Sequence, residues 1–499
     1  MNSTLKQHKV LVANRGEIAL RVIRTCKAMG LKTVAVYSEP DIESLHVRFA
    51  DEAYCLGPAP SSESYLNIDK ILASCKDAGV TMIHPGYGFL SENAAFADAC
   101  AKHNLIFVGP SSQVMTQMGD KIQARIAAKK AKLPLIEGSE DLKDAKQALN
   151  VAQEVGFPIL LKAKAGGGGK GMRLVNTEKD LNSAFDMAQS EAQKAFGNGT
   201  LYIEKYLDKP RHIEVQVFGL STGETLIFGL RDCSVQRRHQ KIVEEAGQLG
   251  LKNQTQEKLH SMAKELCQSL NYQGAGTLEF LVDAQENIYF LEMNTRLQVE
   301  HPVTEWIYGV DLVRMQILNA LQMDQNLHVP PARGHAIEVR IYAEKPTQNF
   351  LPSPGTIDFI QWPSGANVRV DSAIESGHSI TSFYDPMIAK ISCYGQNRDH
   401  CIQQSLIALS ELKISGIDSN TQFLKQILMH PDFVANKVHT QFINESLMQN
   451  FGQNTWTASS VDLALSAVVS CQTQQDLKMP AADNEVAHSS WWQSGLETP

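Results

Sequence analysis

The chain has 499 residues, which is too long for one ordinary hydrophobic core, so we expect two to four domains. Its formal net charge is −8 and it has no run of lysines and arginines, which argues against a nucleic-acid-binding protein. No apolar run approaches the length of a membrane span, and residues 1–9 lack the apolar core of a signal peptide. The nine cysteines include no C-x-x-C pair, as expected for a protein of the reducing cytoplasm.

The N-terminal part of the chain alternates between strand and helix signals. Strands are predicted at residues 10–13, 33–37, 80–83 and 106–108, with an amphipathic helix at 18–29. This alternation predicts a parallel, doubly wound sheet. The G-x-G-x-x-G fingerprint is absent, so nothing supports binding of a nicotinamide or flavin cofactor.

The loop H-P-G-Y-G-F at residues 84–89 follows one of these strands. Ligands bind beyond the carboxyl ends of strands in open parallel sheets, so this loop is a candidate site. A plain Pro/Gly turn explains the pattern equally well. A helical stretch at 112–131 comes next and carries Lys121.

A smaller unit at residues 135–203 contains a glycine run, A-G-G-G-G-K-G at 165–171. Such a run between two strands lets backbone N–H groups close over phosphates. It is not a Walker A loop, because Gly171 rather than Ser or Thr follows Lys170. Glycine runs are often plain flexible loops, but Lys162 on the preceding strand would aim an ammonium group at the same space.

Two polar segments follow this unit. Glu204 ends a strand and fits recognition of a purine edge, and the strand at 212–217 alternates with His212, Glu214 and Gln216 on its polar side. The segment at 231–245 is dense in charge. It is either a solvated charged loop or a substrate-anion site, lined by Gln236, His239 and Lys241.

Two apolar strands flank a short polar turn between residues 276 and 294, which predicts a β-hairpin. Folding it symmetrically about residues 285 and 286 places Glu279 directly opposite Glu292. Like charges directly opposite each other destabilise a sheet, so a positive group is expected between them.

Asn294 lies two residues beyond Glu292 and therefore on the same face. Two carboxylates and an amide oxygen suit Mg²⁺ or Mn²⁺, with substrate phosphates completing the coordination shell. Arg296, Gln298 and Glu300 continue the even spacing, so a cation, an amide and a potential base follow the metal site if the chain stays extended. The alternative is a solvated hairpin face with ordinary alternation.

The C-terminal part holds fewer signals. A strand at 338–341 carries Arg340, a turn at 383–387 carries Asp385, and an αβ-like stretch ends near residue 447. The remaining residues are polar, with one short helical run at 461–471.

Seven motifs in order resemble the biotin carboxylase family of ATP-grasp enzymes. They are N-R-G-E-I-A at 14–19, H-P-G-Y-G-F-L-S-E-N at 84–93, M-G-D-K at 118–121, G-G-G-G-K-G-M at 166–172, E-K-Y at 204–206, R-D-C-S-V-Q-R-R-H-Q-K at 231–241 and E-M-N-T-R-L-Q-V-E-H-P-V-T-E at 292–305. The resemblance runs from about residue 8 to residue 447.

The resemblance implies an α/β (α+β) ATP-grasp fold with five parts. These are a Rossmann-like doubly wound domain at 1–115, a helical linker at 116–134, a mobile lid at 135–205, a catalytic region at 206–447 and a tail at 448–499. The tail resembles the start of the linking domain of acyl-CoA carboxylase α chains. The biotinyl motif Ala/Val-Met-Lys-Met is absent, so we expect a shortened α subunit without its own biotin.

The resemblance also implies roles for individual residues. ATP positions are matched by Lys121, Lys162, Gly168, Gly169, Glu204, Lys205, Tyr206, Leu207, His212, Gln236 and His239, together with Glu279 and Glu292. Two divalent ions, Mg²⁺ or Mn²⁺, are implied at Glu279, Glu292 and Asn294. The bicarbonate site is matched by Lys241, Arg296, Gln298, Val299 and Glu300, and the biotin site by Tyr87, Phe89, Arg340 and Asp385.

The implied reaction is ATP-dependent carboxylation of biotin on a carrier protein or domain. Bicarbonate, deprotonated by Glu300, attacks ATP to give carboxyphosphate, and Arg340 stabilises the enolate-like biotin oxygen. This is the first half-reaction of an acetyl-, propionyl- or methylcrotonyl-CoA carboxylase. The implied partners are the biotinyl carrier, a carboxyltransferase subunit and at least a second copy of the chain, with no nucleic acid or membrane.

The sequence departs from the family at Ala165, Lys170 and Gly247, which predicts an altered lid or biotin-side loop. Two alternative functions remain open at this point. Another ATP-grasp ligase would share the metal site but would not need Arg296, Glu300 or Arg340. A non-catalytic nucleotide-binding subunit would need none of these.

Overall fold

The computed structural model describes residues 5, 7–139, 141, 142, 144–164, 172–238 and 240–448. Several predictions from the sequence fall outside this part of the chain. They concern Ala165, Gly168, Gly169, Lys170, His239 and the helical run at 461–471.

The N-terminal sheet is parallel, as predicted. It contains β1 (Lys9–Val12), β2 (Lys32–Ser38), β3 (Glu52–Gly57), β4 (Met82–His84) and β5 (Ile106–Phe107), in the order β3-β2-β1-β4-β5. The accompanying helices are α2 (Gly16–Ala28), α3 (Leu45–Phe49), α4 (Ile68–Ala78) and α5 (Ala94–Lys102). Val10 and Val12 pack into one core while Leu11 between them packs into another, because successive side chains of a strand point to opposite faces. A sheet with two buried faces explains the continuous apolar run of its central strand.

The helix predicted at 112–131 is two helices. They are α6 (Ser112–Gly119) and α7 (Lys121–Lys130), and Asp120 between them has an extended backbone. The Asp120 carboxylate accepts a hydrogen bond from the N–H of Gln123 at 2.9 Å, so it caps the N-terminus of α7. This capping residue is the physical reason that the predicted helical stretch is divided into two helices.

A three-stranded antiparallel sheet forms a separate small core. It contains β6 (Ile159–Ala163), β7 (Met172–Val175) and β8 (Leu201–Lys205), in the order β7-β6-β8. The helices α8 (Ala145–Val155) and α9 (Glu178–Phe196) pack with it. Ile159 and Leu161 on β6 are fully buried against Phe185 of α9, which fixes this face of the sheet.

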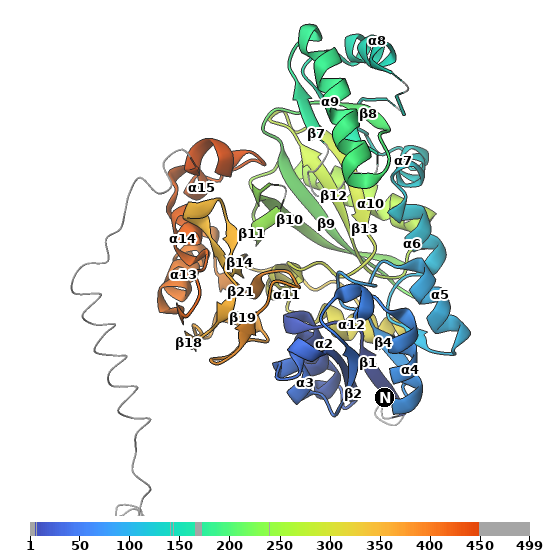
Figure 1. Ribbon diagram of the computed structural model, residues 1–499, viewed down its shortest axis with the longest axis vertical. Helices are drawn as coiled ribbons and strands as arrows, with labels where there is room; N and C mark the ends of the chain where they lie inside the picture. Colours follow the sequence, from blue (N-terminus) through green and yellow to red (C-terminus); the bar gives the residue numbers. More distant parts are fainter. Residues whose placement is uncertain are drawn as a thin grey trace, which may run out of the picture. The chain divides into compact units, whose positions relative to one another are not determined.

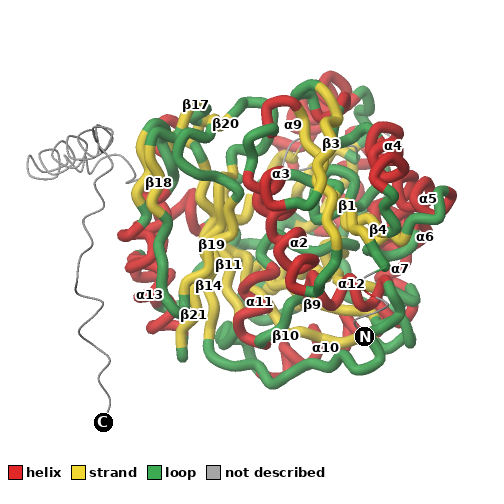
Figure 2. The backbone as a smooth tube through the Cα atoms, turned by 90° about the horizontal axis from the view of Figure 1, so that it is seen from below, coloured by secondary structure: helices red, strands yellow, loops and turns green. Residues whose placement is uncertain are grey.

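The largest sheet has eight antiparallel strands in the order β13-β12-β9-β10-β11-β14-β21-β19 (Figure 1). Their bounds are β9 (Arg211–Gly219), β10 (Thr225–Arg237), β11 (Gln240–Ala246), β12 (Gly274–Val282), β13 (Ile288–Asn294), β14 (His335–Tyr342), β19 (Val368–Ser372) and β21 (Met387–Gly395). Figure 2 shows β11, β14, β21 and β19 running side by side. Three helices lie between these strands in the chain: α10 (Asn253–Ser269) between β11 and β12, and α11 (His301–Tyr308) and α12 (Leu312–Ala320) between β13 and β14.

The C-terminal described residues add three α-helices, a short π-helix (η4, Ile443–Leu447) and short strand pairs. The helices are α13 (Arg398–Glu411), α14 (Thr421–Met429) and α15 (Pro431–Val434). The short strands are β15 (Glu344–Lys345), β16 (Leu351–Pro352), β17 (Gly355–Thr356), β18 (Phe359–Gln361), β20 (Ser379–Ile380) and β22 (Lys413–Ser415). Within the part of the chain that the structure describes, no helix has both the length and the apolar character to cross a bilayer.

Buried ion pairs join the N-terminal helix α2 to the edge strand β19 through α11. Glu305 on α11 accepts from Arg21 Nη2 at 2.8 Å and from Arg369 Nη1 at 2.6 Å, and it is 5% exposed. Arg21 also pairs with Asp311 at 2.9 Å. One carboxylate therefore neutralises cations from two distant parts of the chain.

We expect Glu305→Ala to lower the free energy of unfolding by about 3–5 kcal/mol, because it leaves two guanidinium groups under-compensated in the interior. Urea unfolding followed by circular dichroism measures the loss. The control is Glu375→Ala, which breaks the exposed pair with Arg48 and should cost less than about 1 kcal/mol. Equal losses in the two variants would contradict the assignment.

Candidate functional site

The hairpin of β12 and β13 places Glu279 directly opposite Glu292, as predicted. The pairing is not uniform, however, because Phe280 pairs with Phe290 and leaves Leu291 as an extra residue. This irregularity is a β-bulge. Without it, Glu279 would face Leu291, so the bulge is what brings the two carboxylates onto one face.

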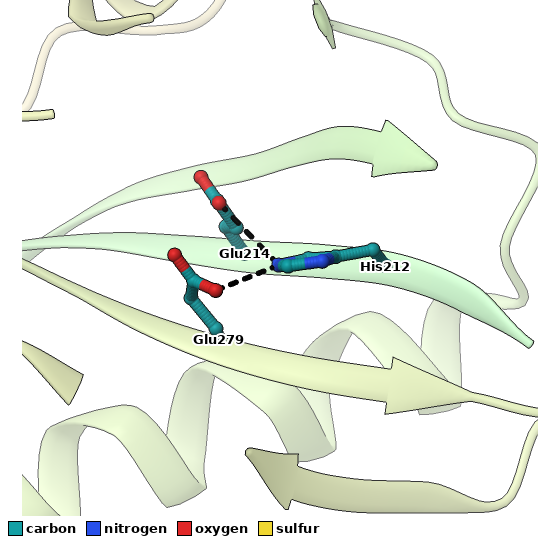
Figure 3. A group of neighbouring side chains, drawn as sticks. All are labelled: His212, Glu214 and Glu279. Carbon is teal, nitrogen blue, oxygen red and sulfur yellow. Dashed lines mark ion pairs between the residues drawn. The ribbon is translucent and has the colours of Figure 1, made fainter. Parts of the chain in front are cut away.

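The predicted positive charge lies on the Glu279 side of the pair. Lys241 Nζ is 2.9 Å from Glu279 Oε1. His212 Nε2 is 3.0 Å from Glu279 Oε2, and Figure 3 shows this ion pair. Burial alone would raise the pKa of Glu279, but Lys241 and then His212 hold that pKa well below its usual range. Desolvation, and then the charge of Glu279, raise the pKa of Glu292.

The raised pKa of Glu292 reflects a repulsion that a divalent cation would relieve. A positive charge between Glu292 and Glu279 would stabilise both carboxylates in their ionised form. Asn294 currently donates from Nδ2 to Glu279 Oε1 at 2.8 Å, while its Oδ1 accepts from Arg296 Nη2 at 3.0 Å. Asn294 therefore presents its amide nitrogen and not its oxygen to Glu279, and the metal site at Glu279, Glu292 and Asn294 stays a prediction.

Lys241 is the cation that several carboxylates share. Its ammonium group lies 2.9 Å from Glu300 Oε1 and 2.9 Å from Glu279 Oε1, and it also bonds to Glu214 Oε1. Burial would lower the pKa of Lys241, but the three carboxylates raise it well above its usual value. Lys241 therefore stays charged at neutral pH.

The sequence predicted no role for Arg231 or Glu214, yet both lie at the centre of the site. Arg231 is fully buried and donates from Nε and Nη2 to Glu214 Oε2 at 3.1 and 3.0 Å. It also donates to Thr277 Oγ1 at 2.9 Å on β12. The polar alternation of β9 marked Glu214 as facing the same side as His212, but it did not indicate which strand would supply the cation.

The charge-dense segment at 231–245 is a hairpin and not a solvated loop. It forms the end of β10 and most of β11, and most of its described side chains are buried. Gln236 Nε2 lies 2.7 Å from His212 Nδ1 and donates to the carbonyl of Cys233 at 2.8 Å. Burial would lower the pKa of His212, but Glu279 and Glu214 raise it to about 9.

Glu300 is fully buried between two cations. Its Oε1 faces Lys241, and its Oε2 lies 2.9 Å from Arg340 Nη2. Arg340 in turn donates from Nε to Glu244 Oε1 at 2.6 Å, a contact for which the sequence gave no signal. Burial raises the pKa of Glu244 to about 7, against the lowering effect of Arg340.

Arg296 and Gln298 reach the site although the chain does not stay extended. The strand β13 ends at Asn294, and the next residues form a turn that leads into α11. Arg296 donates from Nε to Glu92 Oε2 at 2.8 Å and from Nη1 to Gln298 Oε1 at 3.0 Å, while Gln298 donates to Glu279 Oε1 at 3.1 Å. Arg296 and Gln298 therefore reach Glu279 through these side-chain contacts, and not because they lie in one line on an extended strand.

The predicted nucleotide residues lie on β8 and its neighbours. Lys162 on β6 bonds to Glu204 Oε2, and Arg125 Nη1 is 3.4 Å from Glu204 Oε1. Lys205 donates to the carbonyls of Val155 and Gly156 at 2.9 Å, so its ammonium group caps the C-terminus of α8. The remaining three positions are Lys121, the first residue of α7, and the half-buried Tyr206 and Leu207.

The loop at 84–89 is held against the N-terminal sheet. Asn14 donates from Nδ2 to the carbonyls of Pro85 and Tyr87 at 2.8 and 2.7 Å. Gly86 has a φ of +64°, and a Cβ there would lie 3.0 Å from Asn14 Nδ2, so the loop requires glycine at this position. The Tyr87 ring lies 5.6 Å from Lys390 Nζ, which places it beside the strand that pairs with Arg340.

Phe89 and Asp385 lie at the two ends of an aromatic cluster. The Phe89 ring is 5.2 Å from that of Tyr65, which is 5.7 Å from that of Tyr384. Asp385 is exposed and follows Tyr384 in the chain, and its Oδ1 accepts from the N–H of Met387 at 2.9 Å.

The departure at Gly247 has a structural reason. Gly247 has a φ of +127°, and a Cβ there would lie 2.8 Å from the carbonyl oxygen of Gly334 and 2.7 Å from His335 Nδ1. Both the backbone conformation and the close approach to β14 favour glycine. The change therefore sits where β11 ends against β14, next to the strand that carries Arg340.

Three protein-family models match the chain. They are the biotin carboxylase N-terminal domain over residues 6–115, the carbamoyl-phosphate synthase L chain ATP binding domain over 120–327, and the biotin carboxylase C-terminal domain over 338–445. The chain is 49% identical over 449 residues to the biotin carboxylase of Halalkalibacterium halodurans, covering 89% of this chain and 99% of that protein. It is 43% identical over 499 residues to the mitochondrial propionyl-CoA carboxylase alpha chain of Homo sapiens, covering 96% of this chain and 68% of that protein.

Solved structures agree with these relatives. The biotin carboxylase of Campylobacter jejuni in a β,γ-ATP complex superposes with a TM-score of 0.82 at 46% identity, covering 87% of this chain and 98% of that one. The biotin carboxylase domain dimer of the Hydrogenobacter thermophilus 2-oxoglutarate carboxylase, in complex with MgADP, ADP and bicarbonate, gives a TM-score of 0.83 at 43% identity. That match covers 88% of this chain and 97% of the other.

We expect Glu214→Gln to lower the free energy of unfolding by about 3–5 kcal/mol, because it removes the charge that compensates the fully buried Arg231. The side chain keeps its size, so the loss reports on charge and not on packing. Chemical denaturation measures it. The control is Glu224→Gln in the exposed turn between β9 and β10, where a change within about 0.5 kcal/mol is expected. A similarly small change at Glu214 would show that Arg231 does not depend on this carboxylate.

Proposed function

Because the chain belongs to the biotin carboxylase family, we propose that it catalyses the ATP-dependent carboxylation of biotin by bicarbonate. The observation that carries this proposal is the position of Glu300. A buried carboxylate held between Lys241 and Arg340 places a base next to two cations that can bind anionic groups. The products are carboxybiotin, ADP and phosphate, and the reaction is the first half-reaction of an acyl-CoA carboxylase.

Bicarbonate is expected to bind where Lys241, Arg296 and Gln298 converge, next to the backbone of Val299. The Arg296 guanidinium is a planar fork that matches a planar carboxylate-like anion. Glu300 then accepts the bicarbonate proton as a general base. Burial and Glu214 would raise the pKa of Glu300, but Lys241 and Arg340 lower it, so the group is ionised at neutral pH. Its basicity rises when Lys241 turns from Glu300 toward the bound anion.

Biotin is expected to lie between Arg340 and the loop at 84–89. Arg340 is anchored by Glu244, which leaves its guanidinium edge directed at Glu300 and at the site where the ureido oxygen gains charge. A donor that stabilises such an oxyanion typically contributes roughly 3–4 kcal/mol to the transition state. Tyr87 and Phe89 would form the apolar wall, with Asp385 at its rim.

Glu279, Glu292 and Asn294 are the residues that would hold Mg²⁺ or Mn²⁺. Bound metal and nucleotide supply the activated phosphoryl group and the charge neutralisation that bicarbonate attack requires. The nucleotide positions that we propose among the described residues are Lys121, Lys162, Glu204, Lys205, Tyr206, Leu207, His212 and Gln236. Lys205 would contribute through its backbone, because its ammonium group caps α8.

The partners and domain limits complete the proposal. A biotinyl carrier protein or domain must present biotin, a carboxyltransferase subunit must consume carboxybiotin, and the chain is expected to form at least a homodimer in the cytoplasm. The similarity to acyl-CoA carboxylase α chains supports the first two. We keep 1–115, 116–134, 135–205, 206–447 and 448–499 as proposed domain limits.

The proposed function is tested by bicarbonate-dependent ADP release at saturating Mg²⁺, with and without high free biotin. Strong stimulation by biotin is expected. Nucleotide binding without stimulation would favour another ATP-grasp ligase or a non-catalytic subunit.

In the same assay, Glu300→Gln should reduce turnover by roughly 10²–10⁴-fold while ATP binding stays intact, because the base is lost but the nucleotide positions remain. The control is the exposed Glu257→Gln on α10, which should keep full turnover.

Arg340→Ala should reduce biotin carboxylation by roughly 10²–10³-fold, because the charge that develops on the ureido oxygen loses its donor. Biotin-independent ATP hydrolysis should fall much less. The two rates are compared in the same preparation, with Arg333→Ala in the exposed segment before β14 as the control. Equal losses of the two activities would count against an oxyanion role for Arg340.

A further inference from the structure

Lys390 is a fully buried cation in the middle of β21. Strand register places it directly opposite Arg340 on β14 and directly opposite Asp371 on β19. Directly opposed residues of an antiparallel pair point to the same face, so Lys390 and Arg340 lie side by side. Like charges in this arrangement destabilise a sheet, and the carboxylates of Asp371 on β19 and Glu17 on α2 offset the charge of Lys390. Lys390 is therefore a second buried cation next to the arginine that contacts Glu300.

Both cations hold the same short segment of the chain. Arg340 Nη2 donates to the carboxylate of Glu300 at 2.9 Å, and Lys390 Nζ donates to the backbone carbonyl of Val299. The carbonyl of Val299 and the N–H of Glu300 belong to one rigid peptide plane. Lys390 therefore fixes the peptide from which the Glu300 side chain departs.

The turn before α11 needs such a donor. Glu300 is the N-cap residue of α11, and its own carbonyl accepts from the N–H of Val303 at 3.3 Å. The carbonyl of Gln298 lies 2.9 Å from His301 Nδ1. The carbonyl of Val299, between these two, points instead to the large sheet, where Lys390 satisfies it. A buried carbonyl left without a donor would be costly, so the orientation of this peptide depends on Lys390.

Lys390 also connects this turn to the N-terminal part of the chain. Its Nζ lies 3.7 Å from Glu17 Oε1 on α2 and 5.6 Å from the centre of the Tyr87 ring. Glu17 is 8% exposed, and within the described residues its carboxylate oxygens have no hydrogen-bond partner. Burial raises the pKa of Glu17 to about 7, against the lowering effect of Lys390. At 3.7 Å, Glu17 makes no hydrogen bond that would draw Lys390 away from the carbonyl of Val299.

We propose that Lys390 is a positioning residue for biotin carboxylation, which holds the Val299–Glu300 peptide so that the Glu300 carboxylate faces bicarbonate. The catalytic consequence rests on the proposed function, whereas the clamp on the turn does not. A donor at the carbonyl orients the base without occupying the carboxylate oxygens that must accept the proton. Arg340 alone cannot do this, because its contact with Glu300 is to one of those oxygens.

The test compares Lys390→Met and Lys390→Arg with the wild-type chain. Met keeps most of the length of the side chain but removes the donors, while Arg keeps the buried charge but moves the donors. In the Met variant, kcat/KM for bicarbonate should fall by roughly 10–100-fold while KM for ATP stays within about twofold. In the Arg variant, kcat/KM for bicarbonate should fall by roughly fivefold. The control is Lys258→Met, an exposed lysine on α10.

Hydrogen exchange of the peptide covering residues 296–308 provides a readout that does not depend on activity. Faster exchange in this peptide, together with the selective loss for bicarbonate, supports the proposal. A folded Met variant with unchanged bicarbonate kinetics, or with equal rises in KM for ATP and bicarbonate, overturns it.

Two further outcomes are also decisive. If the Met variant does not fold, the Arg variant decides by the same kinetic criteria. If the wild-type chain shows no biotin-stimulated turnover, the proposed function fails. In that case hydrogen exchange of residues 296–308 alone tests whether Lys390 holds the turn before α11. Unchanged exchange in the folded variant overturns this part of the proposal.

Discussion

The site depends on one constraint, which is that a buried carboxylate must be matched by a buried cation. Lys241 meets this requirement for three carboxylates at once, from β9, β12 and the turn before α11. Arg231 and Arg340 then complete the pairing of Glu214 and Glu300. These contacts link β12, β9, β10, β11 and β14, which are consecutive strands of the eight-stranded sheet, so the charges that we propose to serve the chemistry also fix the relative positions of these strands.

Part of the site could be predicted from the sequence because strand periodicity is local information. The alternation of β9 and the two apolar strands of the hairpin predicted which polar side chains share a face, and the structure confirms this for Glu279 and Glu292. The symmetric folding that gave this pair was nevertheless incomplete. The strands next to the turn pair symmetrically about residue 285 alone, which is half a residue earlier than the predicted centre between 285 and 286. The extra residue at the Leu291 bulge shifts the pairing, so that Glu279 still faces Glu292. A bulge depends on how the neighbouring strands pack, so alternation alone does not reveal it.

Other parts could not be predicted because they depend on which strands become neighbours. Glu92 lies 204 residues from Arg296, and Glu244 lies 96 residues from Arg340. The position of Lys390 could not be predicted either, because it lies in an apolar strand where a buried lysine gives no periodic signal. The break at Asp120 is different, because an N-capping residue is visible in the sequence. It was missed because the apolar pattern continues across it.

The density of carboxylates also constrains how an anion can enter the site. In the structure described here, the cations that should bind bicarbonate are occupied: Lys241 faces three carboxylates and Arg296 faces Glu92. An incoming anion must therefore compete with groups of its own charge. His212 also faces Glu279, at 3.0 Å, so part of the charge of Glu279 is compensated before Lys241 turns away. On the function proposed above, a divalent ion between Glu279 and Glu292 would compensate the rest, so we expect bicarbonate to bind more tightly once metal and nucleotide are bound. The carboxylates that hold the sheet together would then also couple the anion site to the phosphoryl donor.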